Sequence, residues 1–273
     1  MKKITLIFLF FLSFLACTNN EKLIEIVDKD TTLSKPNNDY MVLATNWYQQ
    51  SAEMRALYYQ SYNLAKAMIL LNKKQVKQGK KPAVVLDIDE TVLNNSPFEA
   101  KAIQTGINYT SETWKEWTDL AKAEALPGAL DFINFAKQQG VEVFYISNRK
   151  SSELTTTIKN LSDKGFPNAD SSFILLRTET SDKTARRDQV SQNYEIILLV
   201  GDNLTDFSEV FAKRGDDMGF AVVDKYKEDF GTKFIVLPNP MYGEWESAIC
   251  KNSHNWSETQ KDSLRKSKLI IGY

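Results

Sequence analysis

The sequence predicts an α/β fold, a doubly wound, Rossmann-like parallel sheet with a smaller, mainly helical cap region. One observation is an alternation, from residue 83 onward, of uniformly apolar runs with amphipathic segments. Strands that are apolar throughout belong to a parallel sheet covered by helices on both faces. The other observation is a connection, residues 94–127, far longer than the usual link between a strand and a helix. We expect this helical insertion to form the cap.

The candidate strands are six apolar runs. The segments between them, at 128–140, 151–165 and 182–193, have helical character. Ligands bind at the carboxyl ends of the strands in such sheets, so we expect the functional site there. The six runs are residues 83–88, 141–147, 172–177, 195–202, 219–224 and 234–239.

Residues 39–82 precede the first predicted strand and are rich in good helix formers. Apolar side chains recur at helical spacing, for example at Tyr58, Ala65 and Ile69, which predicts N-terminal helices. Residues 83–273 would then hold the core of the protein. The polar stretch 18–38, which contains a proline, is typical of a flexible tether.

Residues 1–17 resemble a bacterial lipoprotein signal peptide. Lys2 and Lys3 precede an apolar run that is too short for a transmembrane helix, and the segment ends in Leu-Ala-Cys. We expect Cys17 to carry a lipid that anchors an exported protein in the cell envelope, at the outer membrane. A plain signal peptide with an incidental cysteine is the alternative. Cys250 is the other cysteine, so a lipidated Cys17 excludes a disulfide.

The overall composition is that of a globular protein. The 273 residues are 42% hydrophobic and 25% charged, which is enough apolar material for a sizeable core. The net charge is −1 and no basic block occurs, so we predict no nucleic-acid partner. A homodimer is left open by the sequence.

Reactive side chains follow the predicted strands. Clustered carboxylates at the mouth of a core repel one another and are costly to bury. A lysine and a bound metal cation would offset that cost. The residues at these strand ends are Asp87, Asp89, Ser147, Asp202 and Asp206, and Lys183 opens a helical segment after the third strand.

This set supports phosphoryl transfer. A carboxylate can attack phosphorus and form an aspartyl-phosphate, and a second acid can protonate the leaving oxygen. Oxygen ligands can hold Mg²⁺, which together with a lysine balances the charge of the phosphate. A pair of carboxylates also occurs in glycosyltransferases and glycosidases. Neither class explains the serine, the lysine and the "GDNLTD" segment in this order.

Several motifs carry a family resemblance. "DIDET", "ISN", the lysine and "GDNLTD" resemble the four motifs of the haloacid dehalogenase-type phosphatases. "LDIDETVLNNS", "FYISNRK", "KTARR", "GDNLTDF" and "PNPMYGEWE" are similar to the class C bacterial acid phosphatases, many of them outer-membrane lipoproteins. This resemblance covers nearly the whole chain after the tether and implies the haloacid dehalogenase type of fold.

The resemblance also implies roles for the strand-end residues. Asp87 would be the nucleophile and a Mg²⁺ ligand, and Asp89 the general acid/base, with its main-chain carbonyl on the metal. Asp202 would bind the metal and Asp206 would support the metal shell. The remaining two residues, which would hold the phosphoryl oxygens, are Ser147 and Lys183.

Three further residues are predicted to bind substrate. Trp114 and Tyr242 could stack on a nucleobase or another ring, although both could equally be core residues. Asn148 follows the family pattern, as does Arg149, to which we assign no role. Asn94 stands where many relatives have an aspartate. Arg186 and Arg187 could reach a phosphate or face solvent.

The predicted function is an Mg²⁺-dependent acid phosphatase, a phosphoric monoester hydrolase acting through an aspartyl-phosphate. The resemblance implies small phosphomonoester substrates, 5′-nucleotides among them, as for a 5′-nucleotidase. A phosphotransferase to alcohol acceptors and a non-enzymatic surface-binding lipoprotein are the alternatives. His254 is the single histidine, which excludes histidine-type and dinuclear metallophosphatases.

Overall fold

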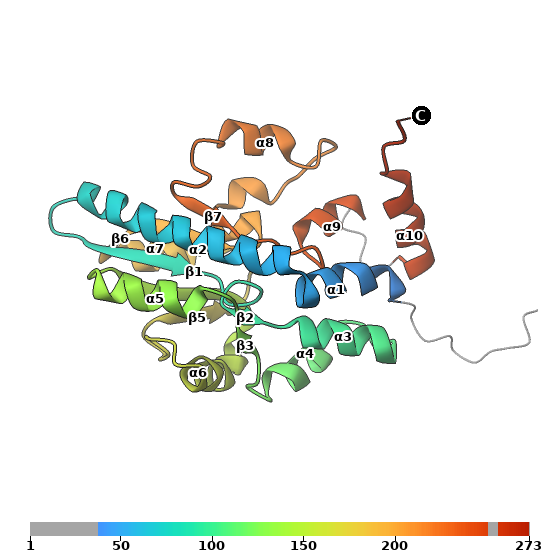
Figure 1. The fold of residues 1–273 in the computed structure, drawn as a ribbon, viewed down its shortest axis with the longest axis horizontal. Helices are drawn as coiled ribbons and strands as arrows, with labels where there is room; N and C mark the ends of the chain where they lie inside the picture. The colour runs from blue at the N-terminus through green and yellow to red at the C-terminus, as the bar shows by residue number, and fades with distance from the viewer. Residues whose placement is uncertain (1–37, 251–255, 273) are drawn as a thin grey trace, which may run out of the picture. The chain divides into compact units, whose positions relative to one another are not determined.

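Five parallel strands form the central sheet of the computed structural model, which describes residues 38–250 and 256–272. The strand order is β5-β4-β1-β6-β7 (Figure 1). The predictions for residues 1–17, for most of the tether and for His254 lie outside the described residues. The strands are β1 (Lys81–Leu86), β4 (Glu142–Lys150), β5 (Ile174–Arg177), β6 (Tyr194–Gly201) and β7 (Phe234–Val236).

This sheet confirms the predicted α/β class and five of the six candidate strands. The prediction for residues 219–224 was wrong, because this segment is the helix α8 (Phe220–Lys225). Gly219 has a left-handed φ of 86°, and the Asp217 carboxylate accepts the N–H groups of Gly219 and Ala221. These bonds cap the start of the helix, and Phe220 stays 70% exposed instead of entering the sheet.

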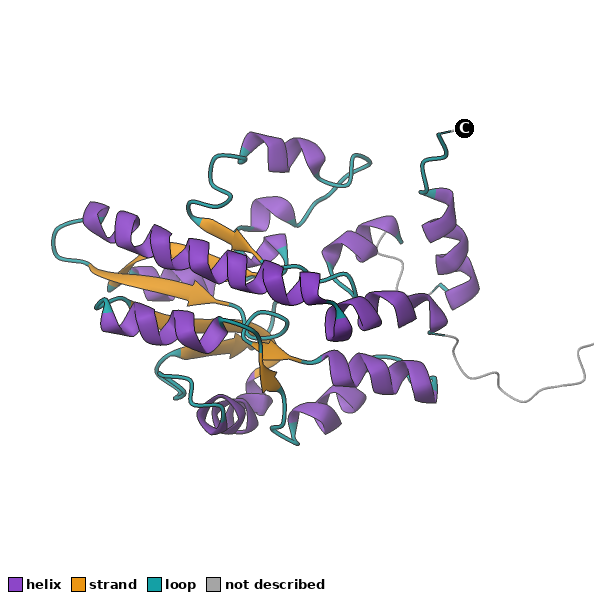
Figure 2. Cartoon of the chain, in the orientation of Figure 1, coloured by secondary structure: helices purple, strands orange, loops and turns teal. Residues whose placement is uncertain are grey.

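Helices cover both faces of the sheet. Side chains alternate along β1, so Val84 and Leu86 pack with α2 (Ala52–Asn72) and α5 (Ala129–Gln138). Figure 1 shows these two helices in front of the strands and α7 (Thr184–Ser191) behind them. Figure 2 shows loops joining helices to strands at both ends of the sheet.

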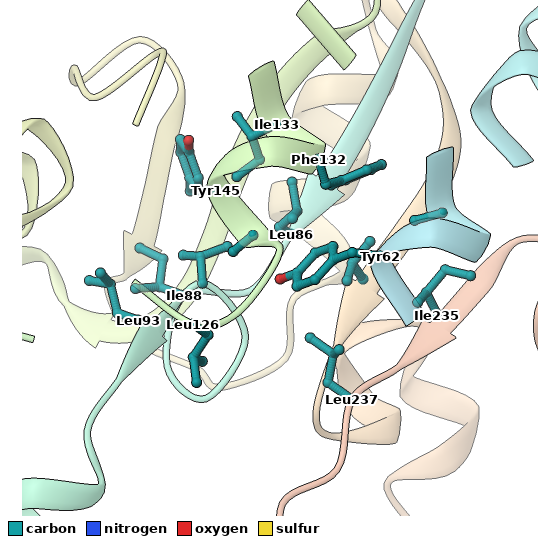
Figure 3. Close-up of a cluster of buried hydrophobic side chains, with 14 of the residues drawn as sticks. Tyr62, Leu86, Ile88, Leu93, Leu126, Phe132, Ile133, Tyr145, Ile235 and Leu237 are labelled. Atoms are coloured by element: carbon teal, nitrogen blue, oxygen red, sulfur yellow. The ribbon is translucent and has the colours of Figure 1, made fainter. Parts of the chain in front are cut away.

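The core between the sheet and α2 and α5 is aromatic and aliphatic (Figure 3). The rings of Tyr62 and Phe132 lie 5.5 Å apart, centre to centre. Tyr62 and Tyr58 are four residues apart on α2, so both face the sheet, and both are fully buried. Their hydroxyls donate to the main-chain carbonyls of Thr91 and Glu90, beyond the end of β1. The N-terminal helices thereby hold the loop that follows β1.

The long insertion is mainly helical. It contains α3 (Ser96–Thr105) and α4 (Ser111–Thr118), and it ends in β3 (Glu124–Ala125), which pairs with β2 (Leu93–Asn94). Gly106 ends α3 in the left-handed conformation, with φ 66°. Asn38, at the end of the expected tether, is buried, and its amide donates to the carbonyls of Ala102 and Ile107.

The remaining elements complete the chain. No helix among the described residues is long and apolar enough to cross a membrane. The other α-helices are α1 (Val42–Gln50), α6 (Leu154–Asp163), α9 (Glu244–Ile249) and α10 (Glu258–Ser267). Short 3₁₀ helices are η1 (Asp39–Met41), η2 (Lys73–Gln75), η3 (Ser151–Glu153), η4 (Leu204–Asp206) and η5 (Glu209–Phe211).

Candidate active site

The loop after β1 is a tight turn that brings its carboxylates together. The Ile88 carbonyl accepts the main-chain N–H groups of Thr91, Val92 and Leu93. Glu90 takes a left-handed φ of 52°, which costs energy in a residue with a side chain. Its buried carboxylate accepts the Asn95 N–H at 2.7 Å and the Tyr242 hydroxyl. These bonds hold the strained turn in place.

Three aspartates converge beside this turn. Asp87, Asp202 and Asp206 each place one carboxylate oxygen within 4.8 Å of the others. Burial raises the pKa of Asp87 to about 7. The positive charge of Lys183 opposes this rise, and the negative charges of Asp206 and Asp89 add to it. Burial also raises the pKa of Asp202 well above its usual range, and the charges of Asp206 and Asp87 add to it. The cluster therefore carries more buried negative charge than it can balance.

Lys183 supplies part of the balance. Its ammonium donates to Asp87 and, at 2.7 Å, to Asp206. Burial alone would lower the pKa of Lys183, but Asp206 and Asp87 hold that pKa above its usual value. The lysine sits just before α7, where the sequence places the start of a helix. It is therefore a fixed positive charge that orients Asp87.

A divalent metal ion fits the rest of the cluster. Carboxylate oxygens are the ligands that hard cations prefer, and such a cation would relieve the repulsion among Asp87, Asp202 and Asp206. Asp202 also accepts from Asn239 at 2.9 Å, which orients its carboxylate. Asp206 is fixed by Lys183 and by the main-chain N–H of Asn203. Asp202 and Asp206 each accept two hydrogen bonds from the chain, whereas Asp87 accepts one, from Lys183.

Asp89 lies on the other side of the turn and is held by Arg149. The guanidinium Nε and Nη2 lie 2.9 and 2.7 Å from Asp89 Oδ1. Ser147 Oγ donates to Asp89 Oδ2 at 3.2 Å, and the Asn95 amide donates to Oδ1 at 2.8 Å. Arg149 is 2% exposed, so this is a buried ion pair. The structure thus shows what Arg149 contacts, which the sequence left unassigned.

A sequence signal for Arg149 did exist. Ser147 and Arg149 are two residues apart on β4, so their side chains lie on the same face of the strand. Asn95 and Glu90, which hold the turn, were also missed. Both stand among other polar residues in the sequence, and only the fold shows their partners.

Arg186 and Arg187 both contact backbone at the site. Arg186 donates to the Ser147 carbonyl at 2.6 Å and to the Asn148 side-chain oxygen at 2.8 Å. Arg187 donates to the Asp206 carbonyl at 3.0 Å. Both arginines therefore brace the loops that carry predicted site residues. Asn94, for its part, accepts the main-chain N–H of Ser96 at the start of α3.

One cavity of about 470 Å³ brings all the predicted site residues together. Trp114 forms part of its lining and packs edge-on against Phe98, with ring centres 5.3 Å apart. Tyr242 also lines it, with its hydroxyl turned to Glu90. Asn148 is exposed at its rim. The predicted residues in the lining are Asp87, Asp89, Trp114, Ser147, Asn148, Lys183, Asp202, Asp206 and Tyr242.

Comparisons with known proteins identify the family of this chain. The family model described as HAD superfamily, subfamily IIIB (acid phosphatase), matches residues 14–245. The class C acid phosphatase from Bacillus anthracis is 43% identical, with a TM-score of 0.81, over 86% of this chain and 98% of that one. A crystal structure of that phosphatase with tungstate bound gives 42% identity, the same TM-score and the same coverage.

A curated plant protein is a more distant relative. The stem 31 kDa glycoprotein of Glycine max is 28% identical over 165 residues, which are 58% of this chain. The chain spans 58% of the length of that relative.

The fold and the strand-end aspartates define a phosphohydrolase site of the haloacid dehalogenase type. The chain belongs to the acid phosphatase family, subfamily IIIB of that superfamily, because the family model matches most of its length. The family and the solved relatives indicate a phosphomonoester hydrolase, which confirms the resemblance seen in the sequence.

Proposed function

We propose that this protein is an Mg²⁺-dependent acid phosphatase that hydrolyses small phosphomonoesters, 5′-nucleotides among them, through an aspartyl-phosphate on Asp87. The observation that carries the proposal is the buried cluster of Asp87, Asp202 and Asp206 with Lys183 at one side. A bound Mg²⁺ ion would neutralise negative charge on the phosphoryl group and on the aspartates.

The chain's own residues would carry the reaction in two steps. In the first, a carboxylate oxygen of Asp87 attacks phosphorus, and the bond to the leaving oxygen breaks as Asp89 supplies a proton. In the second, water attacks the phosphorus, Asp89 takes the proton, and the bond to Asp87 breaks to release phosphate. Lys183 keeps Asp87 aimed at phosphorus, and Ser147 is near enough to Asp89 to contact a phosphoryl oxygen.

Asp89 can act as an acid only when a proton reaches one of its oxygens. In the structure Oδ1 takes the shorter bonds from Arg149, whereas Oδ2 accepts from Ser147 and Arg149 at 3.2 Å each. Oδ2 is therefore the oxygen from which we expect proton transfer. Arg149 would hold the carboxylate in position through Oδ1.

The cavity suits a substrate with a ring. Its volume of about 470 Å³ is in the usual range for small-molecule sites. Trp114 and Tyr109 give it aromatic surface, and stacking contributes about 1–3 kcal/mol per base. The relative with tungstate bound supports oxyanion binding in this family. These features favour nucleotides over phosphates of small aliphatic alcohols.

The test is phosphate release from p-nitrophenyl phosphate, AMP and a sugar phosphate, with Mg²⁺ and with EDTA. We expect Asp87→Asn to lose activity by about a thousandfold or more, because the nucleophile is gone. Asp216→Asn is the matched control, since Asp216 is exposed and outside the cavity. Near-wild-type turnover by Asp87→Asn would disprove the nucleophile. An alcohol acceptor added to the same assay reveals any phosphotransferase activity as a new ester.

We further propose that the protein is exported and held in the cell envelope by a lipid on Cys17. The signal-like composition of residues 1–17 supports this. Labelling with a radioactive fatty acid should mark the wild-type protein and leave Cys17→Ser unlabelled. Equal labelling of the two would remove the anchor from the proposal.

A further inference from the structure

Glu99 is a buried carboxylate that the proposed reaction does not use. It lies on α3 in the helical insertion, lines the same cavity as the aspartates, and is 9% exposed. No cation or hydrogen-bond donor among the described residues contacts its carboxyl group. Buried carboxylates without a partner are costly, so this group is open to a hydrogen-bond donor that the described residues do not supply.

The neighbours of Glu99 do not relieve this cost. Burial raises the pKa of Glu99 to about 7, and the charge of Glu246 adds to the rise. Glu246 itself is paired with Arg265, at 2.5 Å. The Asn38 amide, another group in the lining, already donates to Ala102 and Ile107. Of the three glutamates that line the cavity, Glu99, Glu244 and Glu246, Glu99 is therefore the buried one without a partner among the described residues.

Among the residues that the structure describes, the cavity lining offers no unpaired cation for an anionic leaving group. Its lining contains two cationic residues, Lys183 and Arg149, and both are paired with aspartates of the site. Glu244 and Glu246 line it as well as Glu99. These glutamates do not form a second metal site, because among the described residues only Asp87, Asp202 and Asp206 bring carboxylate oxygens together closely enough.

We propose that Glu99 accepts hydrogen bonds from N–H groups on the leaving group, so that the enzyme prefers phosphomonoesters whose alcohol bears an amide or amine and discriminates against those bearing a carboxylate. This inference rests on the proposed function, since it assigns one wall of the same cavity to the leaving group. The phosphoryl group would lie against Asp87 and Lys183, and the aromatic lining would place the ring of the leaving group. The position of α3 beyond the carboxyl end of β1 agrees with this arrangement (Figure 1).

The test compares two substrates that differ in one group. Nicotinamide mononucleotide carries an amide, and nicotinic acid mononucleotide carries a carboxylate at the same position. The ratio of their kcat/KM values is measured for the wild type, for Glu99→Gln and for Glu112→Gln, all with Mg²⁺. Glu112 is an exposed acid on the neighbouring helix α4 and lies outside the cavity lining, so it is the matched control. A ratio within one enzyme cancels any general change in activity.

At pH 8, above the Glu99 pKa of about 7, we expect the wild type and Glu112→Gln to favour the amide by about tenfold or more, the usual effect of a hydrogen bond to a charged acceptor. Glu99→Gln should bring the ratio close to one, mainly by improving turnover of the acid. An unchanged ratio in Glu99→Gln would overturn the inference while leaving the proposed hydrolysis intact.

A binding measurement separates the two proposals. Nicotinamide riboside, the product alcohol, should bind the wild type more tightly than Glu99→Gln in a calorimetric titration. That difference in binding would support the role of Glu99 even if the enzyme hydrolysed no ester. The absence of hydrolysis would overturn the proposed function alone. Equal binding of the riboside by both proteins would count against Glu99.

Discussion

Two regions of one cavity differ in whether their carboxylates are paired with a cation of the chain. The catalytic floor is formed by Asp87, Asp89, Lys183, Asp202 and Asp206. A cation of the chain binds Asp87, Asp89 and Asp206, and the Asn239 amide orients Asp202. The cap wall, formed by Trp114, Tyr109 and Glu99, contains a carboxylate that has no such partner among the described residues. The difference teaches that the groups proposed for chemistry are held before substrate arrives. The group proposed for selectivity is left for the substrate to satisfy.

The largest effect after loss of Asp87 is expected from Arg149→Met, which breaks the buried pair with Asp89. If Arg149 positions the proton donor, kcat/KM, which reports the step that expels the leaving group, should fall by about a hundredfold for esters of poor leaving groups such as glycerol phosphate. Esters of p-nitrophenol, whose leaving group needs no proton, should lose far less. Steady-state kinetics on both substrates check this.

Two controls sharpen the Arg149 result. Arg149→Lys keeps the charge but not the forked geometry, so we expect only partial recovery. Arg55→Met removes an exposed arginine of α2 and should behave as wild type. Equal losses on both kinds of ester would mean that Arg149 only supports the fold, since breaking a buried ion pair also destabilises a protein.

Gly201→Ala should disturb the floor from the side of Asp206. A Cβ at residue 201 would come within 2.7 Å of the Asp206 carboxyl carbon, so that side chain must move. Lys183 would then lose one of its two carboxylate partners. Because misplacing a catalytic group by about 1 Å can cost a hundredfold in rate, we expect a kcat loss of that order and a higher Mg²⁺ requirement. Gly272→Ala, where an added Cβ meets open space and the backbone φ is not positive, tests for a general effect of substitution.

The smallest effect should come from Glu99→Gln, and it concerns stability. The folded protein holds the pKa of Glu99 at about 7, above the ordinary value of 4.5, so the native state binds the proton more tightly than the unfolded chain. Wild-type stability should therefore fall as pH rises from about 4.5 to about 7. Glu99→Gln lacks this loss and should be more stable at pH 8, by about 2–3 kcal/mol.

Denaturant unfolding at pH 4 and pH 8 checks the prediction. The two proteins should differ at pH 8 and be alike at pH 4, where Glu99 is protonated in both states. A pH-independent difference would show that the substitution acts through packing. It would also weaken the contrast between the floor and the wall.

Much of the fold could be predicted because its signals are local. Apolar runs, such as residues 83–88 and 195–202, and the helical segments between them are each confined to a few neighbouring residues. The helix α8 is the exception, since "GFAVVD" has the composition of a strand. The side chain of Asp217, which precedes it, caps a helix there instead.

The site residues that could be predicted from the sequence are those whose residue type and order match a known chemistry. Asp87, Asp202 and Lys183 were found because their residue types, their order and their places after strands match phosphoryl transfer. The spacing on β4 places Arg149 on the same face as Ser147, but it does not identify the partner of Arg149, because Asp89 lies 60 residues away in the chain. Glu99 gave no signal at all, because a glutamate on a helix is usually exposed.

By itself, the sequence determined the class of fold, the family and the set of strand-end residues. Each of these depends on short motifs that are defined by their residue types and by the order of those residues. The tertiary structure alone decided which charges are paired and which are not. Burial and the approach of distant elements set the free-energy cost of a charge. The carboxylate of Asp87 is therefore paired with Lys183, whereas the carboxylate of Glu99 on α3 has no cation partner among the described residues.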